Sequence, residues 1–323
     1  MMNKIDLIIP VYNVAPYLRQ CLDSVLMQTF QTFKIILVDD GSTDGSGEIC
    51  EEYAVSHTNI EVVHQENKGL SSAKNTGLKY STAPYIMFLD SDDWISPQTL
   101  EIMYNVMEKG DYDIAQCREK LEYDYNVKTI NTNHEKTEVK IYSGLDIYKS
   151  FFSHRELGPA SWGKIYKREI ISNIIFPEGK VHEDIAVIMS IWEKCKSVAY
   201  INASLWHYRF REGSISRTHY SSKNRFMYDC VNNMSTVVAK NPILKPYFDG
   251  YRYLVVKSLF IMFSPEDKIT FSKDYQEYRS ILTKVHWNIL SNRTLRFDER
   301  LSIFLSTSKF HGIIKSLYKI FKK

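Results

Sequence analysis

Cysteine, net charge and long apolar runs are all scarce in this sequence. The five cysteines are odd in number and form no CxxC pair, which argues against a disulfide framework or a zinc site and favours reduced thiols in a cytoplasm. A net charge of +3 is too small to indicate nucleic-acid binding. The most apolar late run, at 253–263, contains Lys257 and is too short to span a bilayer. These absences favour a soluble or peripheral protein.

The N-terminus leads directly into an apolar run at 5–11, so we expect no signal peptide. We therefore expect the protein in the cytoplasm, either soluble or peripheral on the inner face of the cell membrane. The length of 323 residues allows one large domain or two. Oligomeric state is left open by the sequence.

Short apolar runs alternate with amphipathic patterns through the N-terminal third of the chain. We predict strands at 5–11, 33–38, 60–64 and 85–89, with helices between them where apolar residues recur at helical spacing. Strands that alternate with helices form a mainly parallel sheet with right-handed crossovers. The predicted fold class is therefore α/β, a mainly parallel sheet flanked by helices. Ligands of such sheets bind beyond the carboxyl ends of the strands.

The pattern changes after residue 217 to long helical stretches rich in Tyr and Phe. We therefore predict an α/β domain over 1–217 and a helical C-terminal region over 218–323. Near the end, 308–323 places apolar residues on one helical face and lysines opposite, without an acid. Such a segment suits an in-plane helix on an anionic membrane surface. A last helix that packs on its own domain is the open alternative.

Three carboxylates follow the apolar run that ends at Leu89. Side chains two apart on an extended segment point the same way, so Asp90 and Asp92 can converge on one ligand. Oxygen ligands of this kind suit Mg²⁺ or Mn²⁺, and Mg²⁺ usually binds through one or two carboxylates plus substrate phosphates. The alternative is an acidic turn in which Asp93 caps the next helix.

A second acidic turn, at 39–44, follows the predicted strand 33–38. Asp40 at its start can accept hydrogen bonds from a ribose or a base N–H group. Asp44 can also cap the following helix. The spacing of Asp40, Ser42, Asp44 and Glu51 partly matches an EF-hand calcium loop. A strand and not a helix is predicted before this loop, which counts against a calcium site.

The segment 67–77 combines a glycine turn, hydroxyls, amides and the cations Lys68 and Lys74. A helix that begins there presents free N–H groups to an anion or a sugar. The alternative is an ordinary capped helix with both lysines solvated.

Two later segments carry further candidate residues. His182, Glu183 and Asp184 precede an amphipathic helix, and they offer a metal ligand and a general base that takes a proton from an acceptor hydroxyl. Acids are also common at helix starts for electrostatic reasons alone. Arg209 and Arg211 alternate with aromatics and suit a diphosphate. Surface arginines that pack on aromatic rings are the alternative.

Together these segments resemble the family 2 glycosyltransferases of the GT-A fold, which is Rossmann-like. The likeness runs from Ile5 to about Ser216 and rests on the order and spacing of several motifs. The family usually has Arg where this chain has Lys74, which keeps the charge but loses the planar fork. The motifs are Ile9-Pro10-Val11-Tyr12-Asn13, 38–44, Asn67-Lys68-Gly69, 73–77, Asp90-Ser91-Asp92-Asp93, Trp162-Gly163-Lys164 and Glu183-Asp184.

The resemblance implies an inverting, metal-dependent transfer of a sugar from a nucleotide-sugar, with UDP as the expected nucleotide, to a glycan or lipid-linked glycan of a bacterial surface polysaccharide. Asp184 would be the base, with Glu183 beside it, and Asp92 the main Mn²⁺ or Mg²⁺ ligand, with Asp90 and His182 as further candidates. Trp162, Arg209 and Arg211 would face the acceptor or the diphosphate. The residues implied for nucleotide-sugar binding are Pro10, Tyr12, Asn13, Asp40, Asn67, Gly69, Lys74, Asp90 and Ser91.

Two other functions compete with this prediction. A metal-dependent nucleotidyltransferase also uses an α/β fold with clustered carboxylates, but we would expect a glycine-rich basic loop after its first strand, and that strand here ends in Pro10-Val11-Tyr12-Asn13. A non-catalytic sugar-nucleotide-binding or scaffold protein is the second alternative, although all the expected acids are present.

Overall fold

The computed structural model describes residues 2–122, 137–153, 156–210, 219–285 and 288–306. The chain folds into two compact units. The sheet unit comprises Met1–Ile147 and Glu156–Glu212, and the helical unit comprises Tyr148–Arg155 and Gly213–Lys323. The helical unit thus combines the C-terminal part of the chain with a short segment from its middle.

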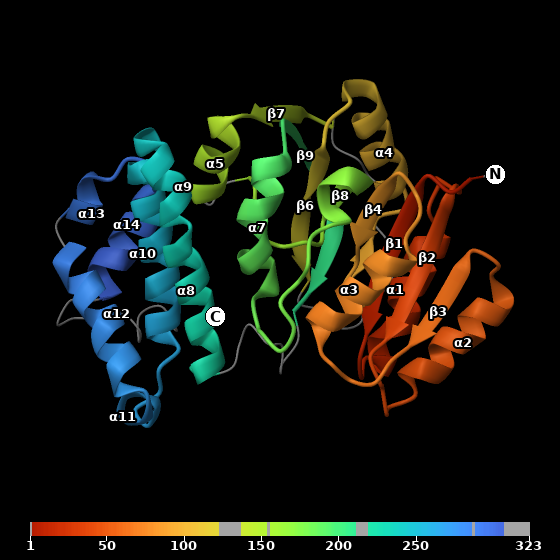
Figure 1. Cartoon of the computed structure of the whole chain (residues 1–323), viewed down its shortest axis with the longest axis horizontal. Helices are drawn as coiled ribbons and strands as arrows, with labels where there is room; N and C mark the ends of the chain where they lie inside the picture. Colours follow the sequence, from red (N-terminus) through yellow and green to blue (C-terminus); the bar gives the residue numbers. More distant parts are fainter. Residues whose placement is uncertain (1, 123–136, 154–155, 211–218, 286–287, 307–323) are drawn as a thin grey trace. The chain divides into compact units, whose positions relative to one another are not determined.

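The sheet unit contains one sheet in which β3, β2, β1 and β4 are neighbours in that order (Figure 1), and these four strands run parallel, as predicted. Beyond β4, β8 pairs antiparallel with both β4 and β6, and β6 pairs parallel with β9. Strands β5 and β7 pair antiparallel with β9. The strands are β1 (Ile5–Val11), β2 (Phe33–Asp39), β3 (Ile60–His64), β4 (Tyr85–Phe88), β5 (Trp94–Ile95), β6 (Ile114–Glu122), β7 (Val139–Ser143), β8 (Lys164–Lys167) and β9 (Ser197–Arg209).

Helices cover both faces of the sheet, because successive side chains of a strand point to opposite faces. The odd-numbered residues of β1, such as Leu7 and Ile9, share a core with α1 and α4, whereas Ile8 faces α3. Gly77 allows this close approach, since a Cβ there would lie 2.2 Å from Ile8 Cγ2. The helices of this part of the chain are α1 (Ala15–Leu26), α2 (Ser46–Ser56), α3 (Leu70–Tyr80), α4 (Thr99–Gly110), α5 (Leu145–Phe152), α6 (Arg168–Ile171) and α7 (Glu183–Lys194).

Strand direction decides where the loops gather. Strands β1, β2, β4, β6 and β9 run the same way, so their carboxyl ends meet at one edge of the sheet. Strands β5 and β8 run the opposite way and therefore begin at that edge. The segments 89–93 and 158–163 consequently meet at the edge where ligands of α/β sheets bind. The predicted α/β class, a mainly parallel sheet flanked by helices with a helical C-terminal region, is confirmed.

The helical unit is held together largely by aromatic contacts. Tyr220 stacks on Phe263 with ring centroids 3.9 Å apart, and Tyr278 packs edge-on to both. Phe152 of α5 packs against Tyr251. The Tyr and Phe residues noted in the sequence therefore supply this core. Its helices are α8 (Arg225–Asn233), α9 (Ser235–Lys240), α10 (Lys245–Ile261), α11 (Asp267–Thr270), α12 (Ser272–Val285), α13 (Asn288–Ser291) and α14 (Phe297–Ser306), with 3-10 turns η2 (Ser222–Asn224) and η3 (Pro242–Leu244).

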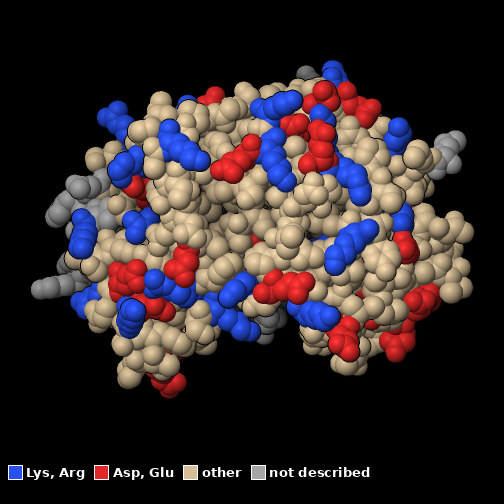
Figure 2. Space-filling view, in the orientation of Figure 1, with Lys and Arg blue, Asp and Glu red and all other residues tan. Residues whose placement is uncertain are grey.

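Acidic and basic side chains are interspersed on the face of the molecule shown in Figure 2. Within the described ranges, no helix combines the length and apolar character needed to cross a bilayer. The predicted membrane-surface segment 308–323 lies outside the described residues, and so does Arg211.

Candidate active site

The acidic turn after β4 divides its three carboxylates between two roles. Asp93 is buried, and its carboxylate accepts hydrogen bonds from Trp206 Nε1 and from the Arg209 backbone N–H, both at 2.8 Å. It therefore fixes the turn to β9. The alternative in which Asp93 caps the next helix is wrong, because α4 begins at Thr99 with Gln98 before it. Asp90 and Asp92 remain as the candidate ligands of this turn.

Lys74 joins α3 to the start of α7. Its side chain is only 1% exposed, and its amine donates to Glu183 Oε1 at 2.7 Å, Asp184 Oδ1 at 3.0 Å and Ser161 Oγ at 2.8 Å. The ring of Phe176 lies beneath it, 5.2 Å from the amine to the ring centroid. The alternative in which Lys74 is solvated is therefore wrong, and the lysine brings two predicted site motifs together.

The charges around Lys74 are unequal in number. Burial raises the pKa of Asp90; Lys74 opposes this shift, and Asp92, Asp184 and Glu183 add to it. Burial disfavours the charged form of Lys74, yet these carboxylates hold its pKa above the usual value. One buried amine thus faces several carboxylates, so the site has negative charge left for a further cation.

A divalent cation fits the oxygen donors of Asp90 and Asp92, which are hard ligands in a region of excess negative charge. Within the described residues, no group of three or more His, Cys, Asp or Glu side chains is arranged to hold a metal ion. Mg²⁺ is usually bound by one or two carboxylates together with substrate phosphates. His182 precedes α7 with φ of +60°, and burial lowers the pKa of its imidazole, which favours the neutral form.

Arg209 lies beside the acidic turn. Its Nε donates to the Asp92 carbonyl oxygen at 2.8 Å, and its guanidinium packs over the rings of Trp94, at 4.6 Å, and Tyr17, at 5.0 Å. A further hydrogen bond joins it to Gln20. Arg209 is 4% exposed, so it packs on aromatics as the alternative proposed, but it is buried next to the candidate metal ligands and not on the surface.

Trp162 belongs to a stack of aromatic rings. It lies 5.5 Å from both Trp206 and Tyr208, centroid to centroid, at angles of 22° and 29°. A β-bridge with Phe88 places its backbone beside the end of β4. The partly exposed indole therefore forms a wall near the acidic turn, which suits the apolar face of a sugar.

Lys164 secures the loop that carries Ser161 and Trp162. Its buried amine donates to the carbonyl oxygens of Gly158, at 3.0 Å, and Ala160. Burial lowers the pKa of Lys164 to about 8. The motif Trp162-Gly163-Lys164 gave Lys164 no role, and Ser161 directly precedes that motif.

The loops after β1 and β2 bind each other. Asn13 has φ of +50°, its backbone N–H donates to Ser42 Oγ at 3.2 Å, and its Oδ1 accepts from the Thr43 N–H at 2.8 Å. Asp44 accepts from the first N–H groups of both α1 and α2. These bonds occupy its carboxylate, and β2 precedes the loop, so the EF-hand alternative is wrong.

Asp40 is engaged by the segment before α3. It is 2% exposed, and its oxygens accept from the N–H groups of Lys68, at 3.0 Å, and Gly69, at 2.7 Å, and from Gln65 Nε2 at 2.6 Å. Asp40 thus holds the 65–69 loop against the end of β2. The other predicted nucleotide-sugar residues lie at the same edge: Pro10 and Ser91 are buried, Asn67 is exposed, and Tyr12 is 48% exposed.

Asn75 supports Lys74 in a way that the sequence did not indicate. Its side-chain amide donates to the Phe176 carbonyl and accepts from the Phe176 N–H, both at 2.9 Å. This pair of bonds fixes Phe176 beneath the amine of Lys74. The one indication that the sequence gave for Asn75 was its position within the 73–77 motif.

Comparison with known proteins agrees with this geometry. The family model Glycosyl transferase family 2 matches residues 6–173, and the chain therefore belongs to the family 2 glycosyltransferases. GlyA of Streptococcus pneumoniae is 34% identical over 266 residues, which cover 80% of this chain and 38% of GlyA. The chain thus spans well under half the length of that relative.

Two solved structures share the fold. S. aureus TarS 1–349 in complex with UDP-GlcNAc has a TM-score of 0.65 at 19% identity, with 96% of this chain and 92% of that chain covered. The mannosyltransferase PcManGT from Pyrobaculum calidifontis, in complex with GDP-Man and Mn²⁺, has a TM-score of 0.58 at 17% identity, with 95% and 86% covered. At these identities the likeness shows the GT-A fold alone.

Proposed function

We propose that this chain transfers a sugar from a nucleotide-sugar, with UDP as the nucleotide, to a hydroxyl of a glycan or lipid-linked glycan, with inversion and with Mn²⁺ or Mg²⁺. The observation that carries the proposal is the convergence of Asp90, Glu183 and Asp184 around Lys74 at the carboxyl edge of the sheet, with Asp92 acting on Asp90. That edge is where α/β sheets bind their ligands.

Asp184 is the proposed base. Its Oδ1 accepts a hydrogen bond from the Lys74 amine at 3.0 Å, and the same amine also donates to Glu183. The carboxylate of Asp184 is therefore held in one orientation. An oriented carboxylate can take the proton of an acceptor hydroxyl while that oxygen attacks the anomeric carbon from the face opposite the nucleotide. Attack from that face gives inversion.

The leaving nucleoside diphosphate needs its developing charge neutralised. A divalent cation at Asp92 and Asp90 would supply that electrostatic stabilisation. The proposed role of Arg209 is to support Asp92, since its Nε donates to the Asp92 carbonyl. Trp162 would bind a sugar face, and Asp40 would shape the nucleotide pocket through the 65–69 loop that it holds.

We further propose that the reaction belongs to surface-polysaccharide assembly in the cytoplasm or at the inner face of the cell membrane. The support is the family together with the basic, apolar pattern of 308–323. The membrane part of this proposal remains a prediction. Recovery of the full chain without binding to anionic vesicles would contradict it.

The test is a donor screen. The full chain with Mn²⁺ is incubated with UDP-, GDP- and dTDP-sugars, and release of nucleoside diphosphate is measured. We expect slow hydrolysis of one donor, lost in Asp92→Ala, and no hydrolysis when Mn²⁺ is chelated. Pyrophosphate as the product would instead indicate the nucleotidyltransferase, and donor binding without turnover, even with acceptors added, would indicate a binding protein.

A further inference from the structure

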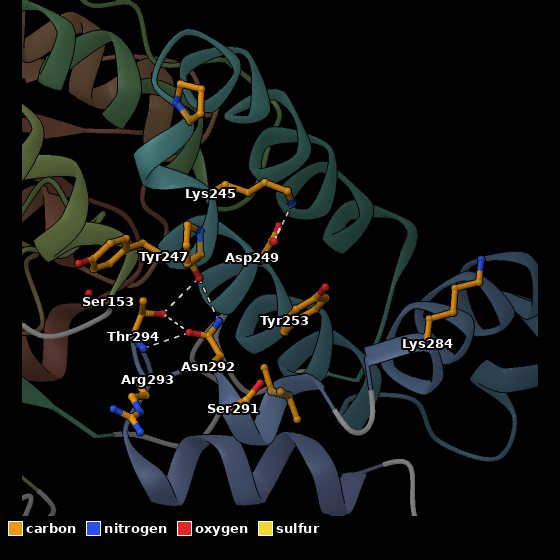
Figure 3. Close-up of a pocket in the computed structure, with 13 residues that line it drawn as sticks. Ser153, Lys245, Tyr247, Asp249, Tyr253, Lys284, Ser291, Asn292, Arg293 and Thr294 are labelled. Carbon is orange, nitrogen blue, oxygen red and sulfur yellow. Dashed lines mark hydrogen bonds and ion pairs between the residues drawn. The ribbon is translucent and has the colours of Figure 1, made fainter.

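A groove of about 1020 Å³ lies in the helical unit and is built wholly from its residues (Figure 3). Sites for drug-sized ligands usually measure roughly 300–1,000 Å³, so the groove has room for more than one sugar ring. Its lining residues are Ser153, Pro242, Lys245, Pro246, Tyr247, Asp249, Tyr253, Lys284, Ile289, Ser291, Asn292, Arg293 and Thr294.

The charge of the lining favours an anion. Lys245 is paired with Asp249 at 2.7 Å, which leaves Lys284 and Arg293 as the excess cations. Both are exposed, and neither has an ionic partner within the described part of the chain. Lys284 and Arg293 stand well apart in Figure 3, so each suits a separate phosphate or carboxylate of an extended ligand, and Arg can bind either group in a bidentate manner.

The rest of the lining suits a carbohydrate. Tyr247 and Tyr253 appear on opposite sides of Asn292 in the view of Figure 3, and half-buried tyrosines offer a flat apolar face with a polar end. Asn292 Nδ2 and Thr294 Oγ1 both donate to the Pro246 carbonyl, at 3.0 Å and 3.2 Å. These bonds make the wall between the tyrosines rigid, which lowers the entropic cost of binding.

A peptide suits the groove less well. Peptides commonly bind by adding a strand to a sheet edge or by placing an apolar helix face in an apolar groove. The groove is formed by helices and their connecting turns, and within its described lining Ile289 is the one aliphatic side chain besides the two prolines. Neither mode of peptide binding has the partner surface that it needs.

We propose that this groove binds a segment of an anionic glycan, with phosphate or carboxylate groups on the cations and sugar rings on the tyrosines. We further identify that glycan as the acceptor of the sugar transfer. This identification rests on the proposed function, whereas the binding site itself does not.

Direct binding to the full chain tests the proposal. The probes are fluorescent tetragalacturonate, a phosphorylated mannose oligosaccharide, neutral maltotetraose, tetraglutamate and a thymidine tetranucleotide. We expect saturable binding of at least one acidic oligosaccharide and weaker binding of the other probes. The two acidic oligosaccharides distinguish carboxylate from phosphate as the recognised group.

Variants locate the binding. Lys284→Ala with Arg293→Ala should weaken it by roughly tenfold or more, since both unpaired cations of the lining and their charge-assisted contacts are lost. Tyr247→Ala should weaken acidic and neutral oligosaccharides alike. The matched control, Lys223→Ala with Lys273→Ala, removes the same charge from exposed positions of the helical unit outside the groove and should change nothing.

Three results would overturn the proposal: no acidic oligosaccharide binds, tetraglutamate or the oligonucleotide binds as well as they do, or both double variants weaken binding equally. Donor hydrolysis without an acceptor should be unchanged in the groove variants. A failed donor screen with intact oligosaccharide binding would reject the proposed function and leave the groove standing.

Discussion

Two lysines of the sheet unit are equally buried but sit in opposite electrostatic surroundings. Lys74 and Lys164 are each 1% exposed. Lys74 donates to two carboxylates, and its pKa is raised, whereas Lys164 donates to backbone carbonyls, and burial lowers its pKa to about 8. Full charges at close range therefore overcome desolvation, while peptide dipoles alone do not.

The comparison also separates two kinds of region. Around Lys74 the carboxylates are brought together at the cost of mutual repulsion, which is expected where charge takes part in chemistry. Around Lys164 the bonds fix the path of the 158–163 loop that carries Trp162. The first region carries the proposed reaction, and the second shapes its wall.

The largest effect should follow from removing the charge of Asp184. We expect Asp184→Asn to lower turnover by about 10²–10⁴-fold, because the amide keeps the size of the side chain but cannot accept the proton. Donor affinity, measured by calorimetry, should be nearly unchanged. The control is Glu193→Gln, which also replaces a carboxylate with an amide, at an exposed position of α7. Wild-type turnover in Asp184→Asn would show that the base is another group.

The next effect concerns stability. We expect Lys74→Met to lower the free energy of unfolding by about 3–5 kcal/mol, because it leaves buried carboxylates without their cation. Lys74→Arg keeps the charge and should recover part of the loss. Urea unfolding followed by tryptophan fluorescence measures both. A loss below about 1 kcal/mol in Lys74→Met would mean that water or protons already compensate these carboxylates.

The sequence predicted the parallel half of the sheet and the loops at its edge, because apolar runs and helical spacing are local signals. It could not predict that Lys74 contacts α7, since its partners Glu183 and Asp184 are 109 and 110 residues away. It separated Asp90 and Asp92 from Asp93 as ligand candidates, but it could not predict what Asp93 does, because the burial of Asp93 depends on Trp206 of β9. Such contacts depend on strand order, and the pattern of short strands such as β5 and β8 does not determine that order.

The smallest effect distinguishes the two lysines by pH. In the unfolded chain a lysine titrates near about pH 10.4. The folded pKa of Lys164 is about 8. Between about pH 8 and the unfolded pKa, the unfolded chain holds a proton at Lys164 more often than the folded chain does. The contribution of Lys164 to the free energy of unfolding therefore rises with pH in this range. The pKa of Lys74 is raised, so its contribution stays constant up to the unfolded value and is lost only above it.

The free energy of unfolding of wild type should therefore rise by about 1–2 kcal/mol relative to that of Lys164→Met between about pH 7.5 and about pH 9.5. Its advantage over Lys74→Arg, which keeps a cation beside Asp90, should stay flat across the same range. Subtracting each variant from wild type removes the other groups that titrate there, since the tyrosines with raised pKa are common to all three proteins. The measurement is urea unfolding at each pH. Parallel curves for the two variants would mean that the amine of Lys164 keeps its ordinary pKa, and that the carbonyls of the 158–163 loop solvate it as well as water does.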